Sequence, residues 1–292
     1  MTGTRLGAAL IVLYTGMMAG ADGITKLIAG GYAAPQLFAI SALVIVGLSL
    51  IVARRRGRHD SLRLRSVRIM AVRAVLTVVA SLAFFQAFRL LPFADVFLFI
   101  GLIPLISAAL SGPVLGEPPR PVAVAALGLG SCGMLFLVPE GPGALQAGHL
   151  WALLAAVTGT LSMLLARWIA RIERVPLAQV FWPNLALGLS MALALPFVWQ
   201  PMSFMDLGWV LAYSGCLFAA RYVVAEALRL LPAFVATPLM NLQFVWMLTI
   251  GYLGFGEVPA AGTMLGVALI IGSGLWLVIE DCLARARVIA AE

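Results

Sequence analysis

The sequence predicts an all-α integral membrane protein with ten transmembrane helices, arranged as two inverted five-helix repeats with both termini cytoplasmic. Three observations predict this fold. The 292-residue chain is 63% hydrophobic and only 11% charged, whereas soluble domains are about 25% charged. Its apolar residues form long continuous runs, and about 20 such residues cross a bilayer as a helix. Two distant stretches, AFRLLP (87–92) and ALRLLP (227–232), agree in five of six letters.

Each helix is an apolar run between two breaks in the chain. Backbone hydrogen bonds inside lipid must be satisfied within a helix or a closed barrel, and runs without alternation favour helices. The expected spans are, in order, 5–29, 33–53, 69–90, 93–115, 120–139, 149–171, 177–199, 206–229, 233–256 and 260–281. The breaks are, in order, Gly30-Gly31, the basic stretch 54–68, Pro92, GEPPR (116–120), PEGPG (139–143), Pro176, QPMS (200–203), Pro232 and GEVP (256–259). Prolines fit these breaks because proline begins a helix well and ends the preceding one.

The distribution of basic residues predicts the orientation. With the N-terminus inside, the outer segments hold two basic residues, Lys26 and Arg89, and the inner segments hold sixteen. Loops rich in Lys and Arg stay in the cytoplasm, so both termini are expected there. The same rule accounts for the net charge of +7 without a nucleic-acid partner. The sixteen are Arg5, Arg54, Arg55, Arg56, Arg58, Arg63, Arg65, Arg68, Arg73, Arg120, Arg167, Arg171, Arg174, Arg229, Arg285 and Arg287.

The repeated letters extend over both halves of the chain. Gly116-Glu117 and Gly256-Glu257 follow the two LLP stretches at equal spacing, and Lys26 matches Arg167 in the second half. Lys26 and Arg167 are 141 residues apart, and the same spacing separates Pro35 from Pro176 and GLS (47–49) from GLS (188–190). Residues 5–139 and 149–281 are therefore expected to be two copies of one five-helix unit. Because five is odd, consecutive copies point in opposite directions through the membrane, and transporters built this way bind substrate between the halves.

This layout resembles the ten-helix members of the drug/metabolite transporter superfamily, whose repeat unit is the EamA domain. The matching features are the A-x-R-x-L-P end of the third helix, the Gly-Glu turns and the glycine-rich fifth helices GLGSCG (128–133) and GVALIIGSG (266–274). The resemblance implies export of small metabolites, commonly amino acids. The family often has a proline midway in the fourth helix of each copy. Pro104 supplies it in the first copy, but Phe244 stands there in the second, so a displaced hinge is expected at Pro238, with Pro183 a further hinge candidate.

Two groups of charged residues lie inside predicted spans, where insertion costs about 2.5–3.5 kcal/mol each. Asp22 and Lys26 share one face of the first helix with Tyr14, and they either line a substrate path or satisfy each other near the outer interface. Arg221 in the eighth helix either binds a substrate carboxylate or forms a structural ion pair with Glu226 or another helix end.

Polar and aromatic side chains supply further candidates for the substrate path. Asp95 either accepts hydrogen bonds at a helix start or binds an ammonium or a proton. Asn184 either compensates for the preceding Pro183 or faces the path. Asn241 is expected to face inward more than Gln243, and Gln86 is a weaker candidate. Aromatic stripes are usually packing, yet four aromatic residues are candidates for a cavity wall, namely Phe84, Phe88, Phe97 and Trp182.

The chemistry that the sequence lacks narrows the function. His59 lies in an expected cytoplasmic loop and His149 on the outer side, the three cysteines have no metal-ligand spacing, and there is no P-loop or nucleophile motif. No enzyme activity, metal or cofactor is therefore expected. We expect a secondary transporter of a bacterial inner membrane, for which a monomer is plausible. It would export a small amphiphilic metabolite, an amino acid with an aromatic or other apolar side chain fitting best, and a proton can couple through Asp22, Asp95 or Glu226. The alternative is a transporter of nucleotide-derived metabolites or drugs, or one that works by uptake.

Overall fold

The computed structural model describes residues 2–29, 31–55, 62–91, 99–117, 147–231 and 239–256, with a few single positions between these ranges. Within them the regular secondary structure is helical. The helices are α1 (Thr2–Ala29), α2 (Ala34–Arg55), α3 (Val67–Leu90), α5 (Ile103–Leu115), α7 (Ala147–Ile172), α8 (Pro176–Val198), α9 (Phe204–Leu230) and α11 (Gln243–Phe255). The predicted helices 120–139 and 260–281 lie mostly outside the described residues.

Six helices in the described part of the chain are long and apolar enough to cross a membrane: α1, α2, α3, α7, α8 and α9. Each holds an 18-residue window with a mean hydropathy of 1.4 or more. Large apolar side chains remain exposed on their outer faces, for example Leu193 at 78% and Phe204 at 96%. A soluble protein would bury such side chains, whereas lipid accommodates them. The chain is therefore a multi-pass membrane protein.

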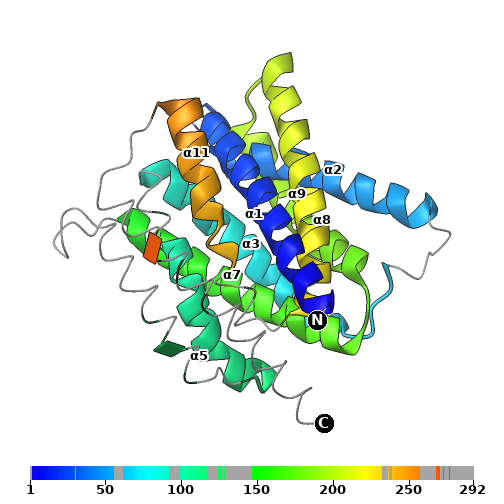
Figure 1. Cartoon of the computed structure of the whole chain (residues 1–292). Helices are drawn as coiled ribbons and strands as arrows, with labels where there is room; N and C mark the ends of the chain where they lie inside the picture. Colours follow the sequence, from blue (N-terminus) through cyan, green and yellow to red (C-terminus); the bar gives the residue numbers. More distant parts are fainter. Residues whose placement is uncertain are drawn as a thin grey trace, which may run out of the picture.

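The main packing partners of each helix come from the other half of the chain. The most extensive pairs are α3 with α7, α1 with α9 and α2 with α8, and Figure 1 shows α9 and α11 on either side of α1. Further pairs are α3 with α8, α2 with α9, α1 with α11 and α5 with α7. This set of pairs is unchanged when α1, α2, α3 and α5 are exchanged with α7, α8, α9 and α11. A two-fold exchange of the two halves would produce such a pattern.

The loops lie at the two ends of the helix bundle. We call one of them the Gly7 end, because it contains Gly7 near the start of α1. There, Gly7 lies against Leu231, and the carboxylate of Glu173 accepts hydrogen bonds from the backbone N–H groups of Arg65 and Ser66 (3.0 and 3.1 Å). Burial raises the pKa of the Glu173 carboxyl, but these hydrogen bonds outweigh burial and hold its pKa below the usual value. The contacts join the start of α1, the start of α3, the end of α7 and the end of α9.

The opposite end of the bundle contains Tyr32. The Tyr32 hydroxyl donates to Asp206 (2.7 Å), and Gln36 exchanges hydrogen bonds with the backbone of Gln200 (2.5 and 3.0 Å). Gly148 lies against Leu91 at this end. From these contacts, α1 runs from the Gly7 end to the Tyr32 end, whereas α7 runs the other way. The pairs α2 and α8, and α3 and α9, are opposed in the same manner.

The fourth helix of each half is interrupted, so the continuous helices predicted over 93–115 and 233–256 are wrong at this point. Helix α5 begins after a turn at Leu102, and α11 begins after a turn at Asn241 and Leu242. Pro104 has no N–H for the preceding turn, which explains the first break. In the second, the N–H of Phe244 bonds to the carbonyl of Asn241, three residues back rather than four. This second break lies at the position that corresponds to the first, although no proline stands there, and the hinge expected at Pro238 lies outside the described residues.

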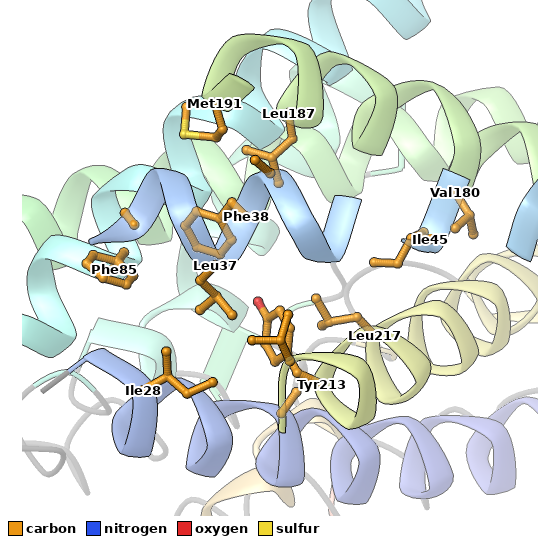
Figure 2. Close-up of a cluster of buried hydrophobic side chains, with 14 residues drawn as sticks. Ile28, Leu37, Phe38, Ile45, Phe85, Val180, Leu187, Met191, Tyr213 and Leu217 are labelled. Atoms are coloured by element: carbon orange, nitrogen blue, oxygen red, sulfur yellow. The ribbon is translucent and has the colours of Figure 1, made fainter. Parts of the chain in front are cut away.

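An apolar cluster fills the space between α1, α2, α3, α8 and α9 toward the Tyr32 end. Leu37 and Ile45 of α2 are fully buried, and Phe38 packs edge-on against Phe85 of α3 with ring centroids 5.8 Å apart. Figure 2 shows Tyr213 of α9 in the same cluster. Because the cluster takes side chains from both halves, the two halves share one core.

Two glycines permit close helix contacts between the halves. A Cβ at Gly7 of α1 would lie 2.7 Å from Leu231 Cγ and 3.3 Å from Leu230 Cβ. A Cβ at Gly148 of α7 would lie 2.6 Å from Leu91 Cγ and 3.1 Å from Leu90 Cβ. The two glycines occupy equivalent positions of the two halves, with the same spacing as Pro35 and Pro176. Small residues let membrane helices approach closely, and here only glycine fits.

Alanine at Gly7 or at Gly148 should therefore destabilise the protein by a similar amount at both sites. Overpacking of this kind costs about 1–3 kcal/mol. Thermal unfolding of the purified protein in detergent measures the loss. Gly20→Ala in α1 is the matched control, because no atom lies within 4 Å of its Cβ. Equal midpoints for G7A, G148A and G20A would show that the close contacts do not constrain the halves.

Candidate functional site

A cavity lies inside the bundle, between the two halves, and consists of two adjoining compartments. The Arg73 compartment has a volume of about 260 Å³ and the Asp22 compartment about 180 Å³. Tyr14, Ser81 and Arg221 line both. Helices α1, α3, α5, α9 and α11 contribute to each compartment. Helix α2 contributes to the Asp22 compartment, and α7 and α8 contribute to the Arg73 compartment. We call the two together the central cavity.

Arg221 of α9 lies at the junction of the two compartments and bonds to α8. Its Nη1 donates to Asn184 Oδ1 at 2.6 Å, while Asn184 Nδ2 donates to the carbonyl of Val180 at 2.6 Å. The ion pair considered for Arg221 and Glu226 does not form. Glu226 instead pairs with Arg229 at 3.1 Å and with Arg174 at 3.8 Å, because its carboxylate faces the Gly7 end of the bundle.

Arg73 of α3 compensates for the proline in α8. Pro183 has no N–H, so the carbonyl four residues earlier, on Gln179, has no helical partner. Arg73 Nη1 donates to that carbonyl at 2.7 Å, and its Nε donates to the carbonyl of Ser162 in α7 at 3.3 Å. Arg73 therefore bonds the carbonyl that Pro183 leaves free, while Asn184 bonds both the neighbouring carbonyl of Val180 and Arg221.

Hydroxyl groups complete the polar surface where α3 meets α7. Thr77 Oγ1 lies 2.8 Å from Ser162 Oγ, and Thr77 also donates to the carbonyl of Arg73 at 2.8 Å. All three residues line the Arg73 compartment. One polar cluster, formed by Arg73, Thr77, Ser162 and Gln179, thus joins α3, α7 and α8 at the cavity wall.

Asp22 connects α1 to the interrupted helix of the second half. Gln243, the first residue of α11, donates from Nε2 to Asp22 Oδ2 at 2.6 Å. Asp22 lines the Asp22 compartment together with Thr25 and Tyr213. Lys26 lies one turn further along α1 and is not among the described lining residues. The Asp22 carboxylate therefore faces the cavity, as the first of the two expectations for Asp22 requires. The second expectation was a mutual Asp22–Lys26 pair near the outer interface.

Aromatic rings form one wall of the Asp22 compartment. Phe84, Phe85 and Phe88 of α3 line it, and the rings of Phe84 and Phe88 stack with centroids 6.1 Å apart. Trp182 does not join them, because its indole N–H donates to the carbonyl of Leu62 at 3.0 Å and its side chain is 39% exposed. An acidic group and an apolar wall thus share one compartment.

The remaining candidates from the sequence fall into three groups. Asn241 and Pro183 are buried and line the Arg73 compartment. Gln86 is partly buried on α3 but is not a described lining residue of either compartment, and Pro104 lies in the first turn of α5. Three candidates lie outside the described residues, namely Asp95, Phe97 and Pro238.

Sequence reasoning missed most of the polar cluster. Arg73 was assigned to the cytoplasmic charge count, although Arg73, Thr77 and Ser81 recur every four residues on one helix face. That stripe was the available signal. Ser162 did not stand out beside Thr158 and Thr160 in its helix, and Gln179 did not stand out beside Asn184. Within the described residues, no group of three or more His, Cys, Asp or Glu side chains is placed to hold a metal ion.

Comparison with known proteins agrees with this architecture. Residues 5–138 match the EamA-like transporter family. No curated protein matches the chain. One solved crystal structure aligns over 95% of this chain and 97% of its own, with a TM-score of 0.74 and 19% sequence identity. At that identity the likeness shows the fold alone, but it extends over both halves.

The fold and the cavity thus define a multi-pass helical membrane protein with a largely apolar cavity inside the bundle, lined in part by polar side chains. Over residues 5–138 the chain is similar to the EamA-like transporter family. That family indicates a membrane transporter of small molecules.

Separating Arg221 from Asn184 should destabilise the protein. Asn184→Leu removes the acceptor of a buried guanidinium, and Arg221→Met removes its donor, each at a cost of about 1–3 kcal/mol. Because the two changes break one interaction, the double variant should lose less than the sum of the single losses. Unfolding in mixed detergent micelles gives the three values, with exposed Ser190→Ala in α8 as control. Additive losses would show that the two side chains do not interact.

Proposed function

We propose that the protein is a secondary transporter that exports a small amphiphilic metabolite by alternating access, with an amino acid as the best-fitting substrate class. The observation that carries this proposal is the central cavity. It presents a guanidinium on Arg221, a carboxylate on Asp22 and a phenylalanine wall within two adjoining compartments. An amino acid offers a carboxylate, an ammonium and a side chain to these three features.

Alternating access requires two packings of similar energy with opposite openings, and an inverted repeat supplies them. Three findings support such a repeat over residues 5–139 and 149–281. Matching letters recur in the two halves at a nearly constant spacing, the helix pairs are unchanged by exchanging the halves, and equivalent helices run in opposite directions. The proposal includes ten spans in total.

The distribution of charge supports the proposed orientation in a bacterial inner membrane. The Gly7 end of the bundle carries most of the described arginines, including Arg63, Arg68 and Arg174. The Tyr32 end carries Lys26 and Arg89. The positive-inside rule then places the Gly7 end, and with it both termini, in the cytoplasm.

The interrupted helices are the places where we expect the conformational change of alternating access to occur. Breaks at Leu102 and at Asn241–Leu242 lie at equivalent points of the halves, and Gln243 at the second break bonds to Asp22. A ligand or a proton on Asp22 would change that bond, and thereby the junction of α1 with α11. This supports Asp22 as the site of a coupling proton in a monomeric transporter.

The alternative is a transporter of the same fold with other cargo or the opposite direction. The aromatic wall of Phe84, Phe85 and Phe88 also suits a nucleobase or an apolar drug. Flux of labelled amino acids, nucleosides and cationic dyes into and out of proteoliposomes distinguishes these cargoes and the direction of transport.

Transport by proteoliposomes should depend on Arg221. Replacement by Gln removes the charge that binds a substrate carboxylate, and loss of such a charge-assisted bond lowers uptake at sub-saturating substrate by about 10- to 100-fold. Arg174→Gln is the matched control, because Arg174 is 68% exposed and lies outside the cavity. Initial rates are measured with equal amounts of inserted protein. Equal flux for R221Q and wild type would remove Arg221 from the substrate site.

A further inference from the structure

The two arginines of the central cavity differ from the other described arginines within the bundle in their partners. Arg167 and Arg171 pair with Glu117 at 3.1 and 3.5 Å, and Arg229 pairs with Glu226. Within the described residues, Arg73 and Arg221 bond only to neutral groups: backbone carbonyls, a methionine sulfur and the Asn184 amide. The described lining of the Arg73 compartment holds no carboxylate. Because a cation away from water is stabilised by an anion, the two guanidinium groups favour an anionic solute in this compartment.

Both guanidinium groups keep hydrogen-bond donors for a ligand. A guanidinium has five N–H donors. Among the described residues, Arg73 uses its Nε and Nη1 groups, which leaves Nη2, and Arg221 uses one N–H of Nη1. Both side chains line the Arg73 compartment. Two planar donors thus face one volume, the arrangement that binds carboxylates or phosphates well.

Gln179 gives a second, independent observation at the wall of the same compartment. Its side chain is 3% exposed and lines the Arg73 compartment, yet its Oε1 has no hydrogen-bond partner among the described residues. Leaving a buried polar atom unbonded is costly, and a water, an ion or a solute in the compartment would relieve that cost. The amide can rotate to present either its oxygen or its N–H₂ group to that molecule.

The two halves differ in the side chains at this helix junction. In the repeat, the positions equivalent to Arg73, Ser162 and Gln179 hold Tyr213, Ala21 and Phe38. These three belong to the apolar cluster near the Tyr32 end, and Figure 2 labels Tyr213 and Phe38 within it. The same helix junction is therefore built once from apolar side chains and once from polar ones. In the polar version Arg73 bonds the carbonyl that Pro183 leaves free and also lines the Arg73 compartment.

We infer that the central cavity accepts a small organic solute with two acidic groups and a net negative charge, one acidic group bound by Arg221 and the other by Arg73. The inference rests on the proposed transport function and narrows its substrate class. Arg73, Arg221 and an ionised Asp22 leave one positive charge in the cavity, which a solute of net charge −1 neutralises. An amino-dicarboxylate satisfies all three residues, because its ammonium can approach Asp22.

Binding to the purified protein in chloride-free detergent buffer tests the inference separately from transport. Glutamate and glutamine have nearly the same shape and differ in one negative charge, and succinate has two carboxylates without an ammonium. We expect glutamate or succinate to raise the unfolding temperature at concentrations about 10- to 100-fold lower than glutamine requires. Asp22→Asn should weaken glutamate but not succinate if the ammonium lies at Asp22.

The variants Arg73→Gln and Arg68→Gln remove one charge each from the same helix, and exposed Arg68 lies outside the cavity. R73Q should lose the preference for glutamate over glutamine, while R68Q keeps it. Arg73→Lys, which retains a donor for the Gln179 carbonyl, replaces R73Q if that variant does not fold, and it should reduce the preference. Equal stabilisation of wild type by glutamate and glutamine, or an unchanged preference in the Arg73 variants, would overturn the inference.

Flux measured in parallel separates the two proposals. Transport of glutamine and other neutral amino acids without any preference for the acidic ones would leave the transporter proposal standing and remove the acidic substrate. Charge-dependent stabilisation without flux of any solute would retain the anion site and remove the transport function.

Discussion

The lack of hydrogen-bonding partners in lipid constrains this structure more than any other factor. A polar group inside a span must find its partner within the protein. Arg73 finds the Gln179 carbonyl that Pro183 leaves free, Arg221 finds Asn184, and Asp22 finds Gln243. Two of these three contacts join helices of different halves, and the third joins two helices of the second half. The polar groups therefore gather where the halves meet, and the cavity lies there for the same reason.

The two halves share a scaffold but not a chemistry. Glycine contacts, helix ends and interrupted helices recur at equivalent positions, as at Gly7 and Gly148. The cavity side chains do not recur. Packing through backbone and small residues sets how the halves fit together, while the few polar groups without charged partners decide what the cavity accepts. In the proposed alternating-access mechanism, such a division would let a symmetric scaffold open in either direction around an asymmetric site.

Much of the scaffold could be predicted from the sequence, since long apolar runs and the constant spacing of repeated letters can be seen without any coordinates. A hinge was expected at Pro238, but the helix break at Asn241 and Leu242 was not predicted, because it depends on a backbone hydrogen bond that no residue type there indicates. Arg221, Asn184 and Asp22 were predicted as candidates because ionisable or amide groups stand out in apolar spans. Arg73 was missed because a basic residue near a helix end satisfies the topology rule, and its contact with Gln179 arises only when α3 packs on α8.

Exposure of the cavity to each side of the membrane is the most direct test of a central path with alternating access. Ser81 lines both compartments. A cysteine placed there, in a protein whose native cysteines are replaced by serine, can be probed with a membrane-impermeant thiol reagent. The account predicts labelling from the cytoplasmic side and, in separate experiments, from the opposite side, with both reduced by a bound substrate. Labelling from one side only under all conditions, or none from either, would contradict it.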